Sequence, residues 1–133
     1  MDYKILVEKA LEARDRAYVP YSKFKVGAAV LFEDNNIYLG CNIENASFGA
    51  TNCAERTAIF KGVSEGNKVI KAIAIVGDIR TYTNPCGICR QVIGEFVESN
   101  DTPIILVKNK DDYIVKTFEE ILPGAFTKKD LEN

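Results

Sequence analysis

Short apolar segments alternate with segments of helical periodicity along this chain, and this alternation constrains its fold more than any other feature. The apolar and β-branched segments predict five strands, at Val26–Phe32, Ile37–Cys41, Ile70–Val76, Ile104–Val107 and Tyr113–Val115. The turn sequence at residues 34–36 joins the first two strands as a hairpin. Only residues 108–112 separate the last two strands, whereas a parallel crossover needs roughly a dozen residues. That last pair is therefore predicted to be antiparallel.

Four helices are predicted around these strands. Apolar residues at helical spacing define the first, namely Leu6, Ala10, Ala13 and Ala17. Asn52 is predicted to cap a second helix from Cys53 to about Val63, and Pro85 opens a third that reaches about Glu98. Residues 117–120 have the pattern of a capping box before a short fourth helix. The order α, β-hairpin, α, β, α, β, β, α predicts an α/β sandwich around a mixed five-stranded sheet, with residues 1–133 forming a single domain.

The chain contains no histidine, which restricts its chemistry sharply. Histidine-dependent triads and His-ligated metal sites are excluded, so acid–base catalysis must use carboxylates and a zinc site must use thiolates. The net charge of −2 argues against a nucleic-acid partner. The longest apolar run, Val26 to Phe32, is too short to span a membrane, and the N-terminus has no pattern of a secretory signal. We therefore expect a cytoplasmic protein without a membrane partner, with its cysteines reduced or metal-bound.

Three cysteines and a glutamate in two distant segments have the spacing of a metal site. Cys86 and Cys89 are three residues apart and share a helix face, so both can bind one ion. Cys53 and Glu55 would diverge by about 200° in a helix interior, so they serve one site only if the ion lies over the helix N-terminus. Thiolates are stabilised there. Three protein ligands leave a fourth zinc position for water, which is typical of a catalytic site.

The charge of such a site predicts a role for a neighbouring arginine. Zinc with three thiolates carries −1, and Glu55 would make this −2. Arg56 supplies +1, and two helix N-termini supply about +0.5 each. We therefore predict that Arg56 donates hydrogen bonds to the cysteine sulfurs, with Gln91 as a weaker candidate for the same task.

Two other interpretations of the cysteines remain open at this point. Cys41 would complete a closed Cys₄ zinc site, which would make the chain a binding module with a structural metal. Alternatively, Cys86 and Cys89 would form a redox-active C-x-x-C pair, although Cys53 and Glu55 would then have no explanation.

Five blocks of the sequence resemble one known family. The blocks are Pro20–Ala29, Gly40–Ala46, Cys53–Arg56, Pro85–Gln91 and Leu122–Phe126. In this order they are similar to the small homotetrameric cytidine deaminases of pyrimidine salvage, and the resemblance covers nearly the whole chain. It implies a three-layer α/β/α sandwich and the zinc-dependent hydrolysis of cytidine and deoxycytidine to uridine and deoxyuridine with release of ammonia. A polynucleotide-editing deaminase is the alternative within this chemistry, although the acidic composition speaks against it.

The resemblance also implies roles for individual residues. Cys53, Cys86 and Cys89 would hold one Zn²⁺ per subunit, and Glu55 would transfer protons between water and the base. The substrate would be bound by Phe24, Asn42, Glu44, the backbone N–H of Ala54, and Phe126 from a neighbouring subunit. A carboxylate at position 44 would accept ribose hydroxyls but repel a phosphate, which favours nucleosides. Phe48 departs from the tyrosine usual in the family, so any hydrogen bond from that hydroxyl is lost.

Overall fold

A mixed five-stranded sheet forms the centre of the molecule in the order β2-β1-β3-β4-β5. The computed structural model describes residues 2–132. The strands are β1 (Gly27–Phe32), β2 (Ile37–Cys41), β3 (Ile70–Val76), β4 (Pro103–Asn109) and β5 (Asp112–Thr117). Strands β3 and β4 are parallel, and the other neighbouring strands are antiparallel. The antiparallel β4–β5 pair confirms the prediction from its short connection.

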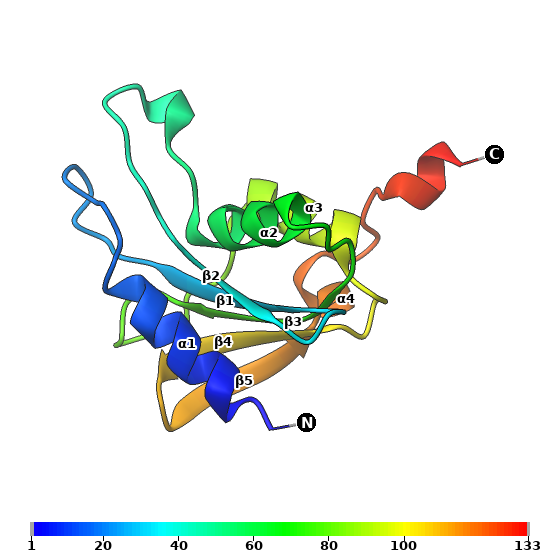
Figure 1. Cartoon of the computed structure of the whole chain (residues 1–133), viewed down its shortest axis with the longest axis horizontal. Helices are drawn as coiled ribbons and strands as arrows, with labels where there is room; N and C mark the ends of the chain where they lie inside the picture. The colour runs from blue at the N-terminus through cyan, green and yellow to red at the C-terminus, as the bar shows by residue number, and fades with distance from the viewer. Residues whose placement is uncertain (1, 133) are drawn as a thin grey trace.

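Helices cover both faces of the sheet, which confirms the three-layer α/β/α architecture (Figure 1). Helix α1 (Lys4–Arg14) lies on one face, and α2 (Ala54–Ser64) and α3 (Gly87–Phe96) lie on the other. The short α4 (Phe118–Ile121) follows β5, and the predicted capping box between Thr117 and Glu120 is confirmed. None of the helices within residues 2–132 has the length and apolar character needed to cross a bilayer.

Two helices end earlier than predicted, and extended residues beyond each end form isolated β-bridges with distant parts of the chain. Helix α1 ends at Arg14, so Ala17 lies beyond it, and Tyr18 then forms a bridge with Ile43. Helix α3 ends at Phe96, because Val97 is extended and forms a bridge with Ile70. Two 3₁₀ helices, Phe48–Ala50 and Lys128–Leu131, were not predicted.

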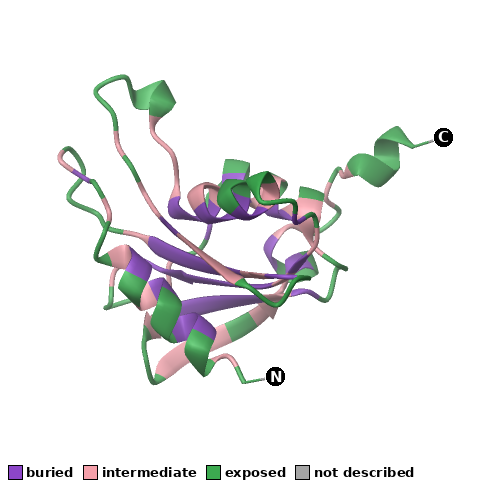
Figure 2. Ribbon diagram, in the orientation of Figure 1, coloured by how far each residue is buried: buried purple, intermediate pink, exposed green. Residues whose placement is uncertain are grey.

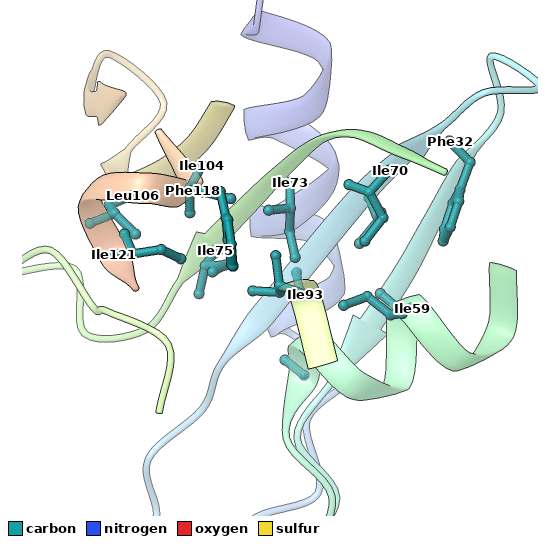
Figure 3. Packing of buried hydrophobic residues seen from close by; sticks show 14 residues of the cluster. Phe32, Ile59, Ile70, Ile73, Ile75, Ile93, Ile104, Leu106, Phe118 and Ile121 are labelled. Atoms are coloured by element: carbon teal, nitrogen blue, oxygen red, sulfur yellow. The ribbon is translucent and has the colours of Figure 1, made fainter. Parts of the chain in front are cut away.

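The sheet separates two hydrophobic cores. The larger core packs bulky side chains of β3 and β4, such as Ile73, Ile75 and Leu106, against α2, α3 and α4 (Figure 3). The smaller core lies under α1, where Ala29, Ala72 and Ala74 allow that helix to lie close to the strands. Buried residues are concentrated in the sheet and on the helix faces toward it, whereas the C-terminal segment is exposed (Figure 2).

Gly40 allows α2 to approach the sheet closely. A Cβ atom at this position would lie 2.4 Å from both the Ala54 carbonyl oxygen and the Ala58 nitrogen. These backbone atoms belong to the first turns of α2 and cannot move aside as the end of a flexible side chain could. The glycine therefore fixes the position of the helix N-terminus next to β2.

We expect Gly40→Ala to lower the free energy of unfolding by about 3 kcal/mol, since it forces α2 away from β2. Gly49→Ala is the matched control, because a Cβ there meets nothing within 4 Å. The control should change stability by less than about 0.5 kcal/mol. Urea unfolding of both variants measures the difference, and equal stabilities would contradict the close-approach explanation.

Candidate metal centre and active site

The sulfurs of Cys53, Cys86 and Cys89 converge at the N-termini of α2 and α3. Cys53 is the N-cap residue of α2, Cys86 is the N-cap residue of α3, and Cys89 lies in the first turn of α3. The three Sγ atoms lie within 4.8 Å of one another, and those of Cys53 and Cys86 are 3.9 Å apart. Cys41 is not part of this group. The structure thus brings together the three predicted ligands and leaves out the cysteine that a closed Cys₄ site would require.

The geometry of the three sulfurs fits a zinc ion. Zinc–sulfur bonds of about 2.3 Å in a tetrahedron place neighbouring sulfurs about 3.8 Å apart, close to the distance between Cys53 and Cys86. Neither N-cap cysteine uses its side chain to cap its helix, so both sulfurs are available as ligands. The prediction that Asn52 caps α2 is wrong, because its amide donates instead to the Thr57 hydroxyl at 3.0 Å.

Within the coupled pair Cys53 and Cys89, the thiolate form is favoured at Cys53 and disfavoured at Cys89. A hydrogen bond from Cys89 lowers the pKa of the Cys53 thiol to about 5, and the Arg56 guanidinium contributes to the same shift. The same bond with Cys53 raises the pKa of Cys89. Cys53 is therefore already ionised near neutral pH, which is the state in which a cysteine acts as a metal ligand.

Arg56 lies directly against the cluster. Its Nη2 donates to Cys53 Sγ at 3.4 Å, and this hydrogen bond raises the pKa of the guanidinium. The Nε atom of Arg56 is buried and has no hydrogen-bond partner. A partly buried cation that bonds to a sulfur offsets part of the negative charge that three thiolates bring to the site.

Glu55 is a buried carboxyl beside the same sulfurs. It occupies the first turn of α2 and is only 4% exposed. Burial raises the pKa of its carboxyl to about 7, and the charge of Cys53 acts in the same direction. A carboxyl with a pKa near 7 is suited both to accept and to donate a proton at neutral pH. This is the group that a histidine-free site needs for proton transfer.

Asn42 and Glu44 brace the loop formed by residues 20–26. The Asn42 amide donates to the Phe24 carbonyl at 2.8 Å and accepts from the Val26 N–H at 2.9 Å. One carboxylate oxygen of Glu44 accepts from the N–H groups of Tyr21 and Ser22, both at 3.0 Å. A hydrogen bond from the Ser22 side chain, together with these backbone N–H groups, lowers the pKa of Glu44 and so favours its charged form. The sequence did not indicate this bracing role, because the residues around Asn42 and Glu44 do not show which distant backbone segment will lie against these side chains.

A cavity of about 430 Å³ opens beside Glu44. It is lined by Tyr21, Ser22, Glu44, Phe48 and Thr51. The rings of Tyr21 and Phe48 meet edge to face with centroids 6.1 Å apart, and Phe48 is 75% exposed. Phe24 is also exposed, and its ring lies over Gly77 at the end of β3.

The C-terminal segment carries the remaining predicted residues. Gln91 donates its side-chain amide to the Phe126 carbonyl oxygen at 2.7 Å, whereas we expected it to bond to the cysteine sulfurs. Its observed contact anchors the C-terminal segment, and the sequence missed this because the segment returns to α3 only in the folded chain. The side chain of Phe126 is 60% exposed. Ala54 is buried as the first residue of α2, where a backbone N–H has no acceptor within the helix.

The pattern of this centre matches one protein family. The family model of the cytidine and deoxycytidylate deaminase zinc-binding region matches residues 2–102. The chain belongs to this deaminase family. The matched region contains the three clustered cysteines and Glu55, so the cluster at the two helix N-termini is the candidate zinc centre of this fold.

Individual deaminases are similar to this chain over its whole length. A cytidine deaminase from Sporosarcina psychrophila is 53% identical over 98% of this chain and 96% of its own length. One from Halalkalibacterium halodurans is 50% identical over the full length of both. The crystal structure of the cytidine deaminase from Burkholderia pseudomallei is 43% identical, has a TM-score of 0.87, and covers 95% of this chain and 100% of its own. The crystal structure of the cytidine deaminase from Mycobacterium tuberculosis is 35% identical and has a TM-score of 0.78. The match covers 95% of this chain and 98% of that one.

We expect Arg56→Ala to weaken zinc retention or turnover of this deaminase by about 10- to 100-fold, because the thiolates lose their hydrogen-bonded cation. Lys61→Ala, at the exposed end of the same helix, removes the same charge away from the sulfurs and is the control. Zinc content after dialysis and kcat of both variants are the measurements. An Arg56→Ala protein with unchanged zinc and kcat would contradict the charge argument.

Proposed function

We propose that this chain hydrolyses cytidine and deoxycytidine to uridine and deoxyuridine with release of ammonia. The observation that carries the proposal is the buried carboxyl of Glu55 beside three converging cysteine sulfurs at two helix N-termini. Membership of the deaminase family and the full-length similarity to proteins named cytidine deaminase support the same reaction.

In the proposed mechanism Cys53, Cys86 and Cys89 hold the zinc ion. When bound, zinc supplies Lewis-acid chemistry that makes water a nucleophile near neutral pH. Glu55 accepts a proton from the attacking water and delivers it to N3 of the base. As this proton reaches N3, the water oxygen bonds to C4. Glu55 then takes the remaining proton of that oxygen and passes it to the amine, so the C4–N4 bond breaks, ammonia leaves and the uracil carbonyl forms. Burial of Glu55 keeps this proton away from bulk solvent.

We assign recognition of the nucleoside to residues around the loop 20–26. Glu44 uses one oxygen to hold this loop, and its second oxygen is the proposed acceptor for ribose hydroxyls. Its negative charge disfavours a substrate phosphate, so a nucleoside is expected to react faster than the corresponding nucleotide. Asn42 positions the loop, Phe24 packs on the base, and the free N–H of Ala54 donates to the base carbonyl.

The direct test follows the loss of absorbance at the cytosine band with cytidine, deoxycytidine and cytidine monophosphate as substrates. Deamination of both nucleosides with much slower reaction of the monophosphate is expected. Absence of turnover by protein that contains one zinc per chain would refute the proposal. Tight, salt-sensitive binding of an oligonucleotide would instead favour the polynucleotide-editing alternative.

We also propose that the chain works as a homotetramer in the cytoplasm, with Phe126 completing the site of a neighbouring subunit. The support is the exposed Phe126 ring, which lies just before the 3₁₀ helix Lys128–Leu131 that extends away from the sheet and helices (Figure 1). The four cysteines are free, as expected in a reducing compartment. Light scattering measures the assembly state, and a fully active monomer would exclude the shared site.

We expect Phe126→Ala to lower kcat/KM by about 10- to 100-fold. This is the loss expected when an aromatic contact worth about 1.5–3 kcal/mol is removed from the site. Co-expression with Glu55→Gln chains distinguishes a neighbour's site from the chain's own. If Phe126 serves a neighbour, mixed assemblies regain activity, because one chain supplies Glu55 and the other supplies Phe126. If mixed assemblies remain as inactive as the separate variants, Phe126 acts within its own chain and the shared-site proposal is wrong.

A further inference from the structure

The side chain of Arg90 connects two segments that are far apart in the sequence. Its Nε donates to the Pro85 carbonyl oxygen at 2.7 Å, and its Nη1 donates to the Ile121 carbonyl oxygen at 2.5 Å. Pro85 immediately precedes Cys86, and Ile121 is the last residue of α4. One guanidinium thus ties the turn that carries a cysteine of the zinc centre to the end of another helix.

Both carbonyl groups lack a partner in regular secondary structure. Pro85 is buried and precedes the N-cap of α3, so its carbonyl lies outside the helix. The Ile121 carbonyl is at the C-terminus of a four-residue helix, where carbonyl groups have no intrahelical donor. A planar guanidinium presents several N–H groups in a fixed fork, so it can satisfy two acceptors that belong to different segments. A lysine in its place would offer no such fixed pair of donors.

We propose that Arg90 is a positioning residue for the zinc centre, because it holds the Pro85 carbonyl and thereby sets the direction of the Cys86 side chain. The inference deepens the proposed function, on which it rests for the use of Cys86 as a ligand. Pro85 is packed, but Cys86 is exposed and a Cβ at the following Gly87 would meet nothing within 4 Å, so packing does not hold the turn at Cys86 itself. The hydrogen bonds of Arg90 supply the constraint that packing does not.

The next residue extends this connection to the C-terminal segment. Gln91 donates to the Phe126 carbonyl at 2.7 Å, so consecutive residues of α3 hold the chain at Ile121 and at Phe126. The turn that bears Cys86 and the segment that bears Phe126 are therefore attached to the same helical turn. A displacement of one is transmitted to the other through α3.

The test compares Arg90→Met and Arg90→Lys with Arg14→Met. Arg14 is the matched control, because its Nε also donates to a backbone carbonyl at 2.7 Å, that of Gly77, and it is likewise partly buried. The first measurement is the rate at which zinc-loaded protein releases zinc to an excess of a chromogenic chelator. The second is the thiolate-to-metal absorption spectrum of the Co²⁺-loaded proteins, which reports ligand geometry without any substrate.

We expect Arg90→Met to release zinc on the order of tenfold faster than the unmodified chain, with an altered cobalt spectrum. Arg90→Lys keeps one hydrogen-bond donor and the charge, so it should release zinc at an intermediate rate. This variant also provides the measurement if Arg90→Met does not fold. Arg14→Met should lose thermal stability without a change in zinc release or spectrum.

Unchanged zinc release and spectrum in both Arg90 variants would overturn the inference. Equal acceleration in Arg14→Met would also overturn it, because the effect would then reflect general destabilisation. Neither measurement uses deamination, so a chain that fails to deaminate cytidine while the Arg90 variants lose zinc faster would refute the proposed function and leave the positioning role supported.

Discussion

Replacement of Glu55 by glutamine is expected to preserve zinc binding and to lower kcat by at least about 10²–10⁴-fold. Glutamine has nearly the same shape and hydrogen-bonding reach, so the buried position in the first turn of α2 remains filled. Its amide is neither an acid nor a base near neutral pH, so it cannot relay a proton. The loss of rate therefore isolates proton transfer from metal binding and packing. Metal analysis and steady-state kinetics on the same preparation give both quantities.

Glu65→Gln is the control for this experiment. Glu65 lies exposed at the C-cap of the same helix, so the substitution removes the same charge without touching the site. It should leave kcat within about twofold of the unmodified chain, as expected for a surface change. Near-normal kcat in a zinc-loaded Glu55→Gln protein would remove Glu55 from the mechanism.

Replacement of Cys86 by serine is expected to abolish stoichiometric zinc binding and, with it, turnover. A serine hydroxyl remains protonated at neutral pH and is a much weaker zinc ligand than a thiolate. Because Cys86 is exposed, the substitution opens no cavity in the core, and the fold should persist. The measurement is the zinc content per chain after gel filtration, together with the circular dichroism spectrum as a check on folding.

Cys41→Ser is the matched substitution outside the cluster. Cys41 ends β2 and is not among the three converging sulfurs, so this variant should keep its zinc and its activity. Loss of zinc from Cys41→Ser would instead favour a closed site with four cysteines. Retention of a full zinc equivalent by Cys86→Ser would show that the ion does not depend on this cluster.

The layers of the fold could be predicted because they depend on local patterns. Alternating helical and strand-like segments indicated the sandwich, and the short connection at residues 108–112 required the antiparallel final pair. The ends of α1 and α3 were placed too late, since the chain beyond each helix becomes extended and Tyr18 and Val97 form β-bridges with distant residues. Such pairing depends on tertiary structure, and a local periodicity does not report it.

The convergence of the three cysteines could be predicted from their spacing in the sequence. Two cysteines three residues apart share a helix face, and a third at another helix N-terminus can meet them there. Gln91 was assigned to the wrong partner, and Arg90 was not singled out, since both bond to backbone that returns from the C-terminal segment. A backbone carbonyl leaves no signature in residue type, so such contacts become visible only in the structure.

The absence of side-chain caps on α2 and α3 links local order to metal content. Serine, threonine, aspartate and asparagine are the preferred N-cap residues because their side-chain oxygens satisfy the first amides, but here cysteines occupy both N-cap positions and make no such bond. A single cation held between the two helix starts would restrain both at once. Zinc occupancy then determines how far these first turns fray, which amide hydrogen exchange would report. A chain without zinc would lose the arrangement of its catalytic groups well before it unfolds.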